Sequence, residues 1–138
     1  MFKKIMVPVD LRHVERIRHA LDVAADLANH YGVEVCYVAV TSPEPSELGH
    51  TPSEVEQRLK AFGADMARLS GHKTTTHLIV SNDPAIDLDK KLLAAIDDAQ
   101  ADLVVMASHI PNVTDYIWAS HGGTIAKRAD ASVMLVRG

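Results

Sequence analysis

The sequence alternates between short apolar runs, most of them uninterrupted, and longer stretches with helical periodicity. Strands that are covered by helices on both faces are continuously apolar rather than alternating, which is typical of a parallel sheet. The alternation of strands and helices predicts right-handed crossovers and a three-layer α/β sandwich, in one domain over residues 1–138. The five predicted strands are residues 5–9, 33–40, 77–80, 103–107 and 133–136.

Apolar residues recur at steps of three and four between these runs, as on the buried face of a helix. Thr51 can cap the second helix, Pro52 suits its first position, and Glu54 completes a capping box. Asp83-Pro84 gives a similar start signal for the third helix, and the last helix is predicted over residues 123–128. The predicted inner faces are Ile17, Leu21, Ala24, Ala25 and Ala28 on the first helix, Val55, Leu59, Phe62, Met66 and Leu69 on the second, and Leu88, Leu92 and Ile96 on the third.

Two local features qualify this pattern. Pro8 lies in the first predicted strand but has no N–H for a ladder bond, so we place it near the strand's C-terminal end. Residues 41–50, rich in Pro, Ser and Glu, form the longest irregular connection and are predicted to be a mobile loop near the ligand side.

Composition narrows the class of protein. The net charge of −4 gives no general attraction to nucleic acid or to an anionic membrane. The single cysteine, Cys36, excludes an internal disulfide framework and is interpreted as a small buried hydrophobic residue. The sequence shows neither a signal-peptide pattern nor an apolar stretch of membrane-spanning length, so we expect a cytoplasmic protein.

Candidate binding residues follow the first, second and fourth strands. Open parallel sheets bind ligands outside the carboxyl ends of their strands, where the strand order reverses. Asp10 could contact a ribose or a metal-bound phosphate there, and residues 40–42 would form an adjacent wall. Residues 104–109 and 119–124 resemble a strand, a loop and a small-residue turn opening a helix, where unpaired N–H groups stabilise an anion. Together they predict nucleotide binding.

Each candidate also has a structural interpretation. Asp10 could instead be a cap or turn residue before the first helix, and Ser120 and Thr124 could cap the last helix rather than bind phosphate. His109 could touch phosphate or be an exposed loop histidine, and His121 could offer positive charge beside the turn when it is protonated. Gly122 and Gly123 are explained in either case by the backbone conformation of the turn.

Catalytic and metal sites are not indicated. The eight histidines are spread along the chain without ligand spacing beside cysteines or carboxylates. A P-loop signature, a serine nucleophile elbow and a catalytic lysine at the phosphate turn are also missing. Tyr116 and Trp118 are predicted to pack the preceding loop against the body or a partner, with base stacking as the alternative. We therefore predict a protein that is not an enzyme.

Residues 5–10, 102–108 and 129–137 carry a resemblance to the universal stress protein family that covers essentially the whole chain. The resemblance implies a five-stranded sheet in the order 3-2-1-4-5, a homodimer and, in one branch, ATP held without strong catalysis. It also implies that the C-terminal strand, at the sheet edge, pairs antiparallel with its twin. The alternative is an edge covered by a loop.

The glycine motif of the nucleotide-binding branch is altered here. That branch carries Gly-x-x-Gly and then, after a spacer, Gly followed by Ser or Thr. This chain has Ala107, Ile110, Ala119 and Ser120 at those positions, with a spacer one residue shorter. Residues 107–111, Ala-Ser-His-Ile-Pro, are more similar to a second branch that carries Gly-Ser-Arg/His-x-Pro and includes ATP binders. Gly122 and Gly123 would restore flexibility and exposed amides one turn later.

The leading hypothesis is a small cytoplasmic stress-response protein that binds an adenine nucleotide as a homodimer. ATP, with or without Mg²⁺, would place its base near Val9 and the end of the second strand, its ribose near Asp10, and its phosphates against residues 107–109 and 119–124. A nucleotide-free dimeric adaptor is the alternative, and an ATPase is a third hypothesis. The predicted binding residues are Pro8, Val9, Asp10, Val40, Ala107, Ser108, His109, Ala119, Ser120, His121, Gly122, Gly123 and Thr124.

Overall fold

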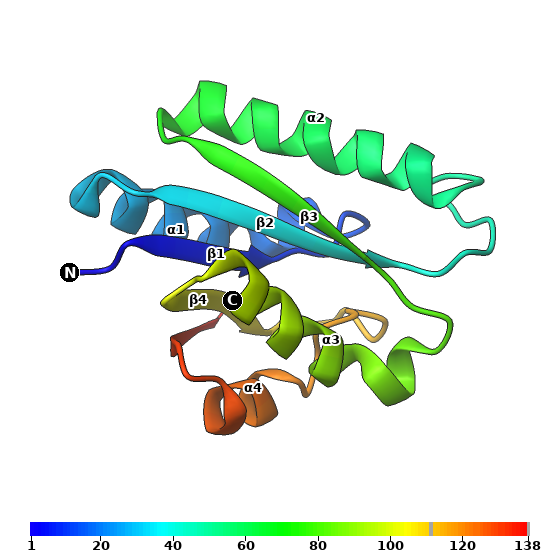
Figure 1. The fold of residues 1–138 in the computed structure, drawn as a ribbon. Coiled ribbons are helices and arrows are strands. Elements are labelled where there is room, and N and C mark those ends of the chain that lie inside the picture. The colour runs from blue at the N-terminus through cyan, green and yellow to red at the C-terminus, as the bar shows by residue number, and fades with distance from the viewer. Residues whose placement is uncertain (111, 138) are drawn as a thin grey trace.

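The sheet has the strand order that the resemblance implies. A computed structural model describes the chain except residues 111 and 138. Its strands form one five-stranded sheet in the order β3-β2-β1-β4-β5, and every neighbouring pair is parallel. The predicted fold class is thereby confirmed (Figure 1). The strands are β1 Lys4–Pro8, β2 Glu34–Thr41, β3 Thr74–Val80, β4 Leu103–His109 and β5 Ser132–Arg137.

Helices cover both faces of the sheet. Right-handed crossovers place α1 and α2 on one face, and α3 and α4, which contact each other, on the opposite face (Figure 1). The predicted inner faces of α1 and α3 are confirmed as buried. The helical elements are the 3-10 segment η1 Val14–Ile17 and the helices α1 Arg18–Tyr31, α2 Pro52–Ser70, α3 Pro84–Ala99 and α4 Gly122–Arg128.

The prediction for the last turn of α2 is wrong. Leu69 is 66% exposed, although Val55, Leu59 and Met66 are buried as expected. The third buried position of α2 is Gly63 rather than Phe62. At the C-terminal end of the helix, Leu69 therefore lies to the side of the buried face. Phe62 is half-buried and meets the Tyr37 ring edge-on, with 5.1 Å between ring centroids.

The two predicted helix starts are capped differently. Thr51 caps α2 as predicted, its Oγ1 accepting the Glu54 N–H at 3.3 Å, but the Glu54 carboxylate accepts the His50 N–H instead of closing the expected box. At α3 the Asp83 side chain makes no cap. Ser81 instead fixes the turn before α3, because its Oγ accepts the Asp83 N–H at 3.2 Å and its hydroxyl donates to Asp87 in the first turn of the helix.

The position of Pro8 agrees with the sequence argument. Pro8 is the last residue of β1, opposite Val38 of β2. On the other side of β1, the pairing with β4 involves Ile5 and Met6. The missing N–H of Pro8 therefore costs no ladder bond there, and β1 can pass through the middle of the sheet up to the edge where ligands bind.

Gly63 allows α2 to pack closely on β3. A Cβ at this position would lie 2.9 Å from Thr76 Cγ2, and the β-branched Thr76 has little rotamer freedom. We expect Gly63→Ala to lower the free energy of unfolding by about 1 kcal/mol. In a Thr76→Ser background the same change should raise it by about 0.5–1 kcal/mol, because alanine is the better helix former. Urea denaturation of the four proteins tests this, and a stabilising Gly63→Ala single variant would contradict it.

His72 gives the fold a pH dependence. Its Nε2 is 3.0 Å from the Tyr37 hydroxyl, and its Nδ1 is buried without a hydrogen-bond partner among the described residues. Burial disfavours the charged imidazolium and lowers the pKa of His72 from its ordinary 6.5. The unfolded chain therefore binds the proton at a higher pH than the folded chain, and stability must fall as pH decreases through this range.

We therefore expect His72→Gln to reduce the loss of stability between about pH 7 and pH 5. Urea denaturation at several pH values measures this slope. His77→Gln, which changes an exposed histidine of β3, is the matched control and should retain the wild-type slope. Equal slopes in wild type and His72→Gln would contradict the assignment.

Candidate functional site

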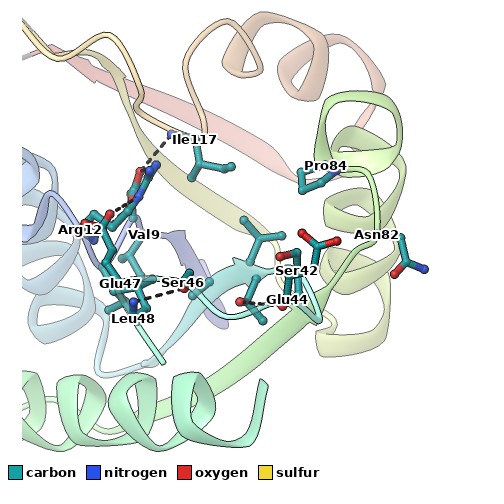
Figure 2. A pocket seen from close by; sticks show the side chains of 15 residues that line it. Val9, Arg12, Ser42, Glu44, Ser46, Glu47, Leu48, Asn82, Pro84 and Ile117 are labelled. Carbon is teal, nitrogen blue, oxygen red and sulfur yellow. Dashed lines mark hydrogen bonds and ion pairs between the residues drawn. The ribbon is translucent and has the colours of Figure 1, made fainter. Parts of the chain in front are cut away.

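A pocket of about 480 Å³ opens at the carboxyl ends of β1 and β2 (Figure 2). Its walls also include the loop after β2, the turn before α3 and one residue of the segment before α4. The volume lies within the usual range for small-molecule sites. The lining residues are Val9, Asp10, Leu11, Arg12, Ala39, Val40, Thr41, Ser42, Glu44, Ser46, Glu47, Leu48, Asn82, Pro84 and Ile117.

Asp10 is a buried carboxylate with four hydrogen bonds, and it is only 3% exposed. Its Oδ1 accepts the Arg12 backbone N–H and Nε, each at 3.1 Å. Its Oδ2 accepts Arg12 Nη2 at 2.9 Å and the Ile117 N–H at 3.0 Å. Burial alone would raise the pKa of Asp10, but the bonds from Arg12 and Ile117 outweigh it and hold the pKa below its ordinary value. The turn role considered for Asp10 is confirmed.

Arg12 joins three parts of the chain around the pocket. Besides its bidentate contact with the Asp10 carboxylate, Arg12 donates from Nη1 to Asp115 Oδ2 at 3.2 Å and from Nη2 to the Asp115 carbonyl. Its Nε also lies 3.8 Å from Glu47 Oε1 in the loop after β2 (Figure 2). The guanidinium therefore links the end of β1 to both segments that border the site.

The aromatic residues before α4 pack against the body of the protein, as predicted. Trp118 is 1% exposed, and its Nε1 donates to the Val9 carbonyl at 3.0 Å. Tyr116 is buried too, and its hydroxyl donates to the Ala107 carbonyl at 3.3 Å. Burial raises the pKa of the Tyr116 hydroxyl, which keeps it protonated as this donor. These contacts fill the space between the ends of β1 and β4.

The turn before α4 uses amides that the sequence argument had left free. The Ala119 N–H donates to the Tyr116 carbonyl at 3.1 Å, and the His121 N–H donates to the Trp118 carbonyl at 3.2 Å. His121 Nδ1 lies 2.5 Å from Asp89 Oδ1 of α3, which puts a carboxylate beside the turn. Ser120 adopts a φ of 70°, a left-handed conformation that glycine would hold with less strain.

The capping interpretation of Ser120 and Thr124 is wrong. The helix α4 begins at Gly122 with His121 at the N-cap position, and no side chain in the described part of the chain caps it. Thr124 lies in its first turn. Gly122 permits close approach to β5, because a Cβ there would lie 2.7 Å from Leu135 Cδ2, whereas a Cβ on Gly123 would meet open space.

Comparison with known proteins decides the family. The family model described as the universal stress protein family matches residues 1–137. The chain belongs to the universal stress protein family.

Solved structures share the fold of this family member at low sequence identity. One is a universal stress protein from Archaeoglobus fulgidus, with a TM-score of 0.69, 22% identity and 98% of both chains covered. Another is a universal stress protein in complex with cAMP, with a TM-score of 0.69, 17% identity and 98% of this chain and 97% of that chain covered. A third, from Archaeoglobus fulgidus in complex with dAMP, has a TM-score of 0.63, 21% identity and 96% of both chains covered.

In this universal stress protein the pocket gathers only part of the predicted site. Val9, Asp10 and Val40 line it, and the buried Pro8 precedes them on β1. Ser108 is turned toward β5, where its Oγ lies 3.5 Å from the Val136 carbonyl. Pro111 and the side chain of His109 lie outside the described residues. The other predicted residues, which are separate from the pocket lining, are Ala107, Ala119, Ser120, His121, Gly122, Gly123 and Thr124.

The sequence did not predict the charged residues of the pocket other than Asp10. Arg12 was available from its spacing, since a residue two positions after a turn aspartate can donate its N–H to that carboxylate. Glu44 and Glu47 belong to the predicted loop, but their place in the lining and the approach of Glu47 to Arg12 depend on the path of that loop. Among the described residues, no group of three or more His, Cys, Asp or Glu side chains is placed to hold a metal ion.

Proposed function

We propose that this universal stress protein binds the adenosine part of an adenine nucleotide in the pocket at the ends of β1 and β2. The observation that carries the proposal is the pocket itself. Apolar side chains of Val9, Ala39 and Val40 line one wall, next to hydroxyl groups and the charged pair of Asp10 and Arg12. Two structures that share its fold were solved with cAMP and dAMP, which supports an adenine ligand.

The pocket suits a base and a ribose better than a polyphosphate. A flat base can pack on the apolar wall, while Thr41, Ser42 and Asn82 offer polar atoms to its edge or to the ribose. Asp10 already accepts four hydrogen bonds, which is the capacity of a carboxylate, so a ribose hydroxyl would have to replace one of them. The turn at 119–121 does not suit the phosphates of ATP, because two of its amides are engaged and the Asp89 carboxylate lies beside it. For Mg²⁺, the described residues contain no group of three or more His, Cys, Asp or Glu side chains placed to hold a metal ion.

We further propose a regulatory role rather than catalysis. Among the described lining residues there is no histidine, cysteine or lysine to pair with a hydroxyl as nucleophile and base. Part of the lining comes instead from irregular segments that a ligand can rearrange, namely the loop over residues 42–48 and the segment that carries Ile117. Occupancy of the pocket would change the surface that these segments present to a partner protein.

Thermal unfolding and calorimetry with adenosine, AMP and ATP test the binding proposal. A ligand that binds the folded state must raise the melting temperature, by an amount that grows with ligand concentration. Val40→Phe should abolish the shift because its ring fills the pocket, whereas Val80→Phe, at the end of β3 and outside the lining, should retain it. If none of the three compounds shifts the melting temperature or gives heat, the proposal is wrong.

A nucleotide-free adaptor is the second candidate, and the turn before α4 favours it. The amides of Ala119 and His121 are satisfied within the turn, and Trp118 fills the adjoining space. This candidate requires that the melting temperature and the binding of a protein partner be unchanged by every adenine compound. The same titrations therefore separate the two functions.

We also propose a homodimer through the edge strand β5. This strand lies at the end of the sheet, and its Met134 and Leu135 are 39% and 42% exposed. Leu135→Glu should produce a monomer in light scattering. Leu69→Glu, at the exposed leucine of α2, should leave the oligomeric state unchanged. A wild-type monomer at micromolar concentration would contradict the proposal.

Within the described residues, no helix combines the length and the apolar composition that crossing a bilayer requires.

A further inference from the structure

The side chains that line the pocket carry more negative than positive charge. Arg12 is the one cation among the described lining residues, whereas Asp10, Glu44 and Glu47 are acidic. Glu47 is 67% exposed at the rim, and Glu44 is exposed in the same loop. Carboxylates at a pocket mouth repel an anionic ligand before it makes any contact.

Arg12 has little donor capacity to spare. A guanidinium has five N–H groups. Two of them hold Asp10, one holds the Asp115 carboxylate, and one holds the Asp115 carbonyl. A single N–H, on Nη1, is left for a ligand, which is enough for one phosphate oxygen and too little for a chain of phosphates.

The space beyond Arg12 gives a polyphosphate no further support. Ile117 and Trp118 close the side toward α4, where each is bonded to the end of β1. Beyond them, Asp89 lies against His121 and adds another carboxylate. Multiple phosphates would therefore meet negative charge on both sides of this wall, and among the described lining residues only Arg12 is a cation that could balance them.

We infer that the pocket selects adenine nucleosides by charge, admitting a ligand with no phosphate or one phosphate and rejecting ATP, with Glu44 and Glu47 as the specificity-determining residues. This inference rests on the proposed function, because it assigns the ligand class of the same pocket. Arg12 provides the single favourable contact for a phosphate. The two glutamates impose the penalty that grows with each additional phosphate.

Isothermal titration calorimetry with adenosine, AMP and ATP tests the inference, with EDTA present and at low salt. We expect ATP to bind at least about tenfold more weakly than AMP. The repulsion between an added phosphate charge and a carboxylate near the protein surface is large enough to change an affinity by about this factor. The double variant Glu44→Gln/Glu47→Gln should raise the ratio of ATP affinity to adenosine affinity about tenfold. Raising the salt concentration should produce a change in the same direction, because it screens the repulsion.

The matched control is Glu15→Gln/Glu56→Gln, which removes the same charge from exposed positions outside the pocket lining. It should leave the affinity ratio at the wild-type value. ATP binding as tightly as AMP, or an unchanged ratio in the pocket variant, overturns the inference while leaving the proposed function intact. If adenosine, AMP and ATP all fail to bind, the proposed function and the inference both fall.

Discussion

Replacing Trp118 by alanine is expected to lower the free energy of unfolding by about 4 kcal/mol. The side chain is 1% exposed and fills the gap between the ends of β1 and β4. Its removal leaves a cavity where the neighbours are held by the sheet and cannot collapse. It also leaves the Val9 carbonyl without the donor that now satisfies it at 3.0 Å. Urea denaturation followed by circular dichroism measures the loss.

Trp118→Phe separates the two contributions. Phenylalanine keeps much of the apolar contact but cannot donate to Val9, so its stability should fall between those of wild type and Trp118→Ala. Because Trp118 is the single tryptophan of the chain, wild-type fluorescence reports the same transition independently. A loss below about 1 kcal/mol for Trp118→Ala would show that the cavity is absent or filled.

Asp10→Asn is expected to cost about 3 kcal/mol. The substitution removes a buried negative charge that pairs with Arg12, and it turns one acceptor oxygen into a donor that faces other donors. Because the pKa of Asp10 is depressed in the folded chain, the contribution of this carboxylate is complete above its ordinary pKa of 3.8. That contribution is lost as pH falls through the lower folded value.

The stability gap between wild type and Asp10→Asn should therefore be constant near neutral pH and shrink in strong acid, as urea denaturation can show. Glu15→Gln serves as the comparison, because Glu15 pairs with Arg18 at 3.0 Å but is 85% exposed. We expect it to change stability by less than about 0.5 kcal/mol. An Asp10→Asn protein as stable as Glu15→Gln would contradict the role assigned to the buried pair.

The apolar pattern was sufficient for the fold class, but not for the strand order or for every boundary. The central strands β1 and β4 are continuously apolar because helices cover both faces, and their order follows once the family resemblance is recognised. β3 begins three residues earlier than residue 77, since Thr74, Thr75 and Thr76 are polar in composition but β-branched in shape. Leu69 fails for the opposite reason, because it fits the helical period but lies beyond the buried stripe of α2.

The candidate site was less accessible from sequence. Asp10 could be found because it follows a buried strand at the end of the sheet where ligands bind. The contacts of Arg12 with Asp115 and Glu47 could not, since they join residues about a hundred and about thirty-five positions apart through loops without periodicity. The amides of Ala119 and His121 were predicted free because a small-residue turn does not reveal that Tyr116 and Trp118 carbonyls will accept them.

The central place of β1 in the sheet has a consequence for synthesis on the ribosome. Of the five strands of the sheet, β1 is translated before the others, yet its two neighbours are β2 and β4, and β4 comes only after the helices α1, α2 and α3. A nascent chain can assemble β1, β2 and β3 early, but one side of β1 then stays unpaired until residues 103–109 emerge. During that interval the growing polypeptide presents an open, apolar strand edge, the kind of surface that chaperones shield from aggregation.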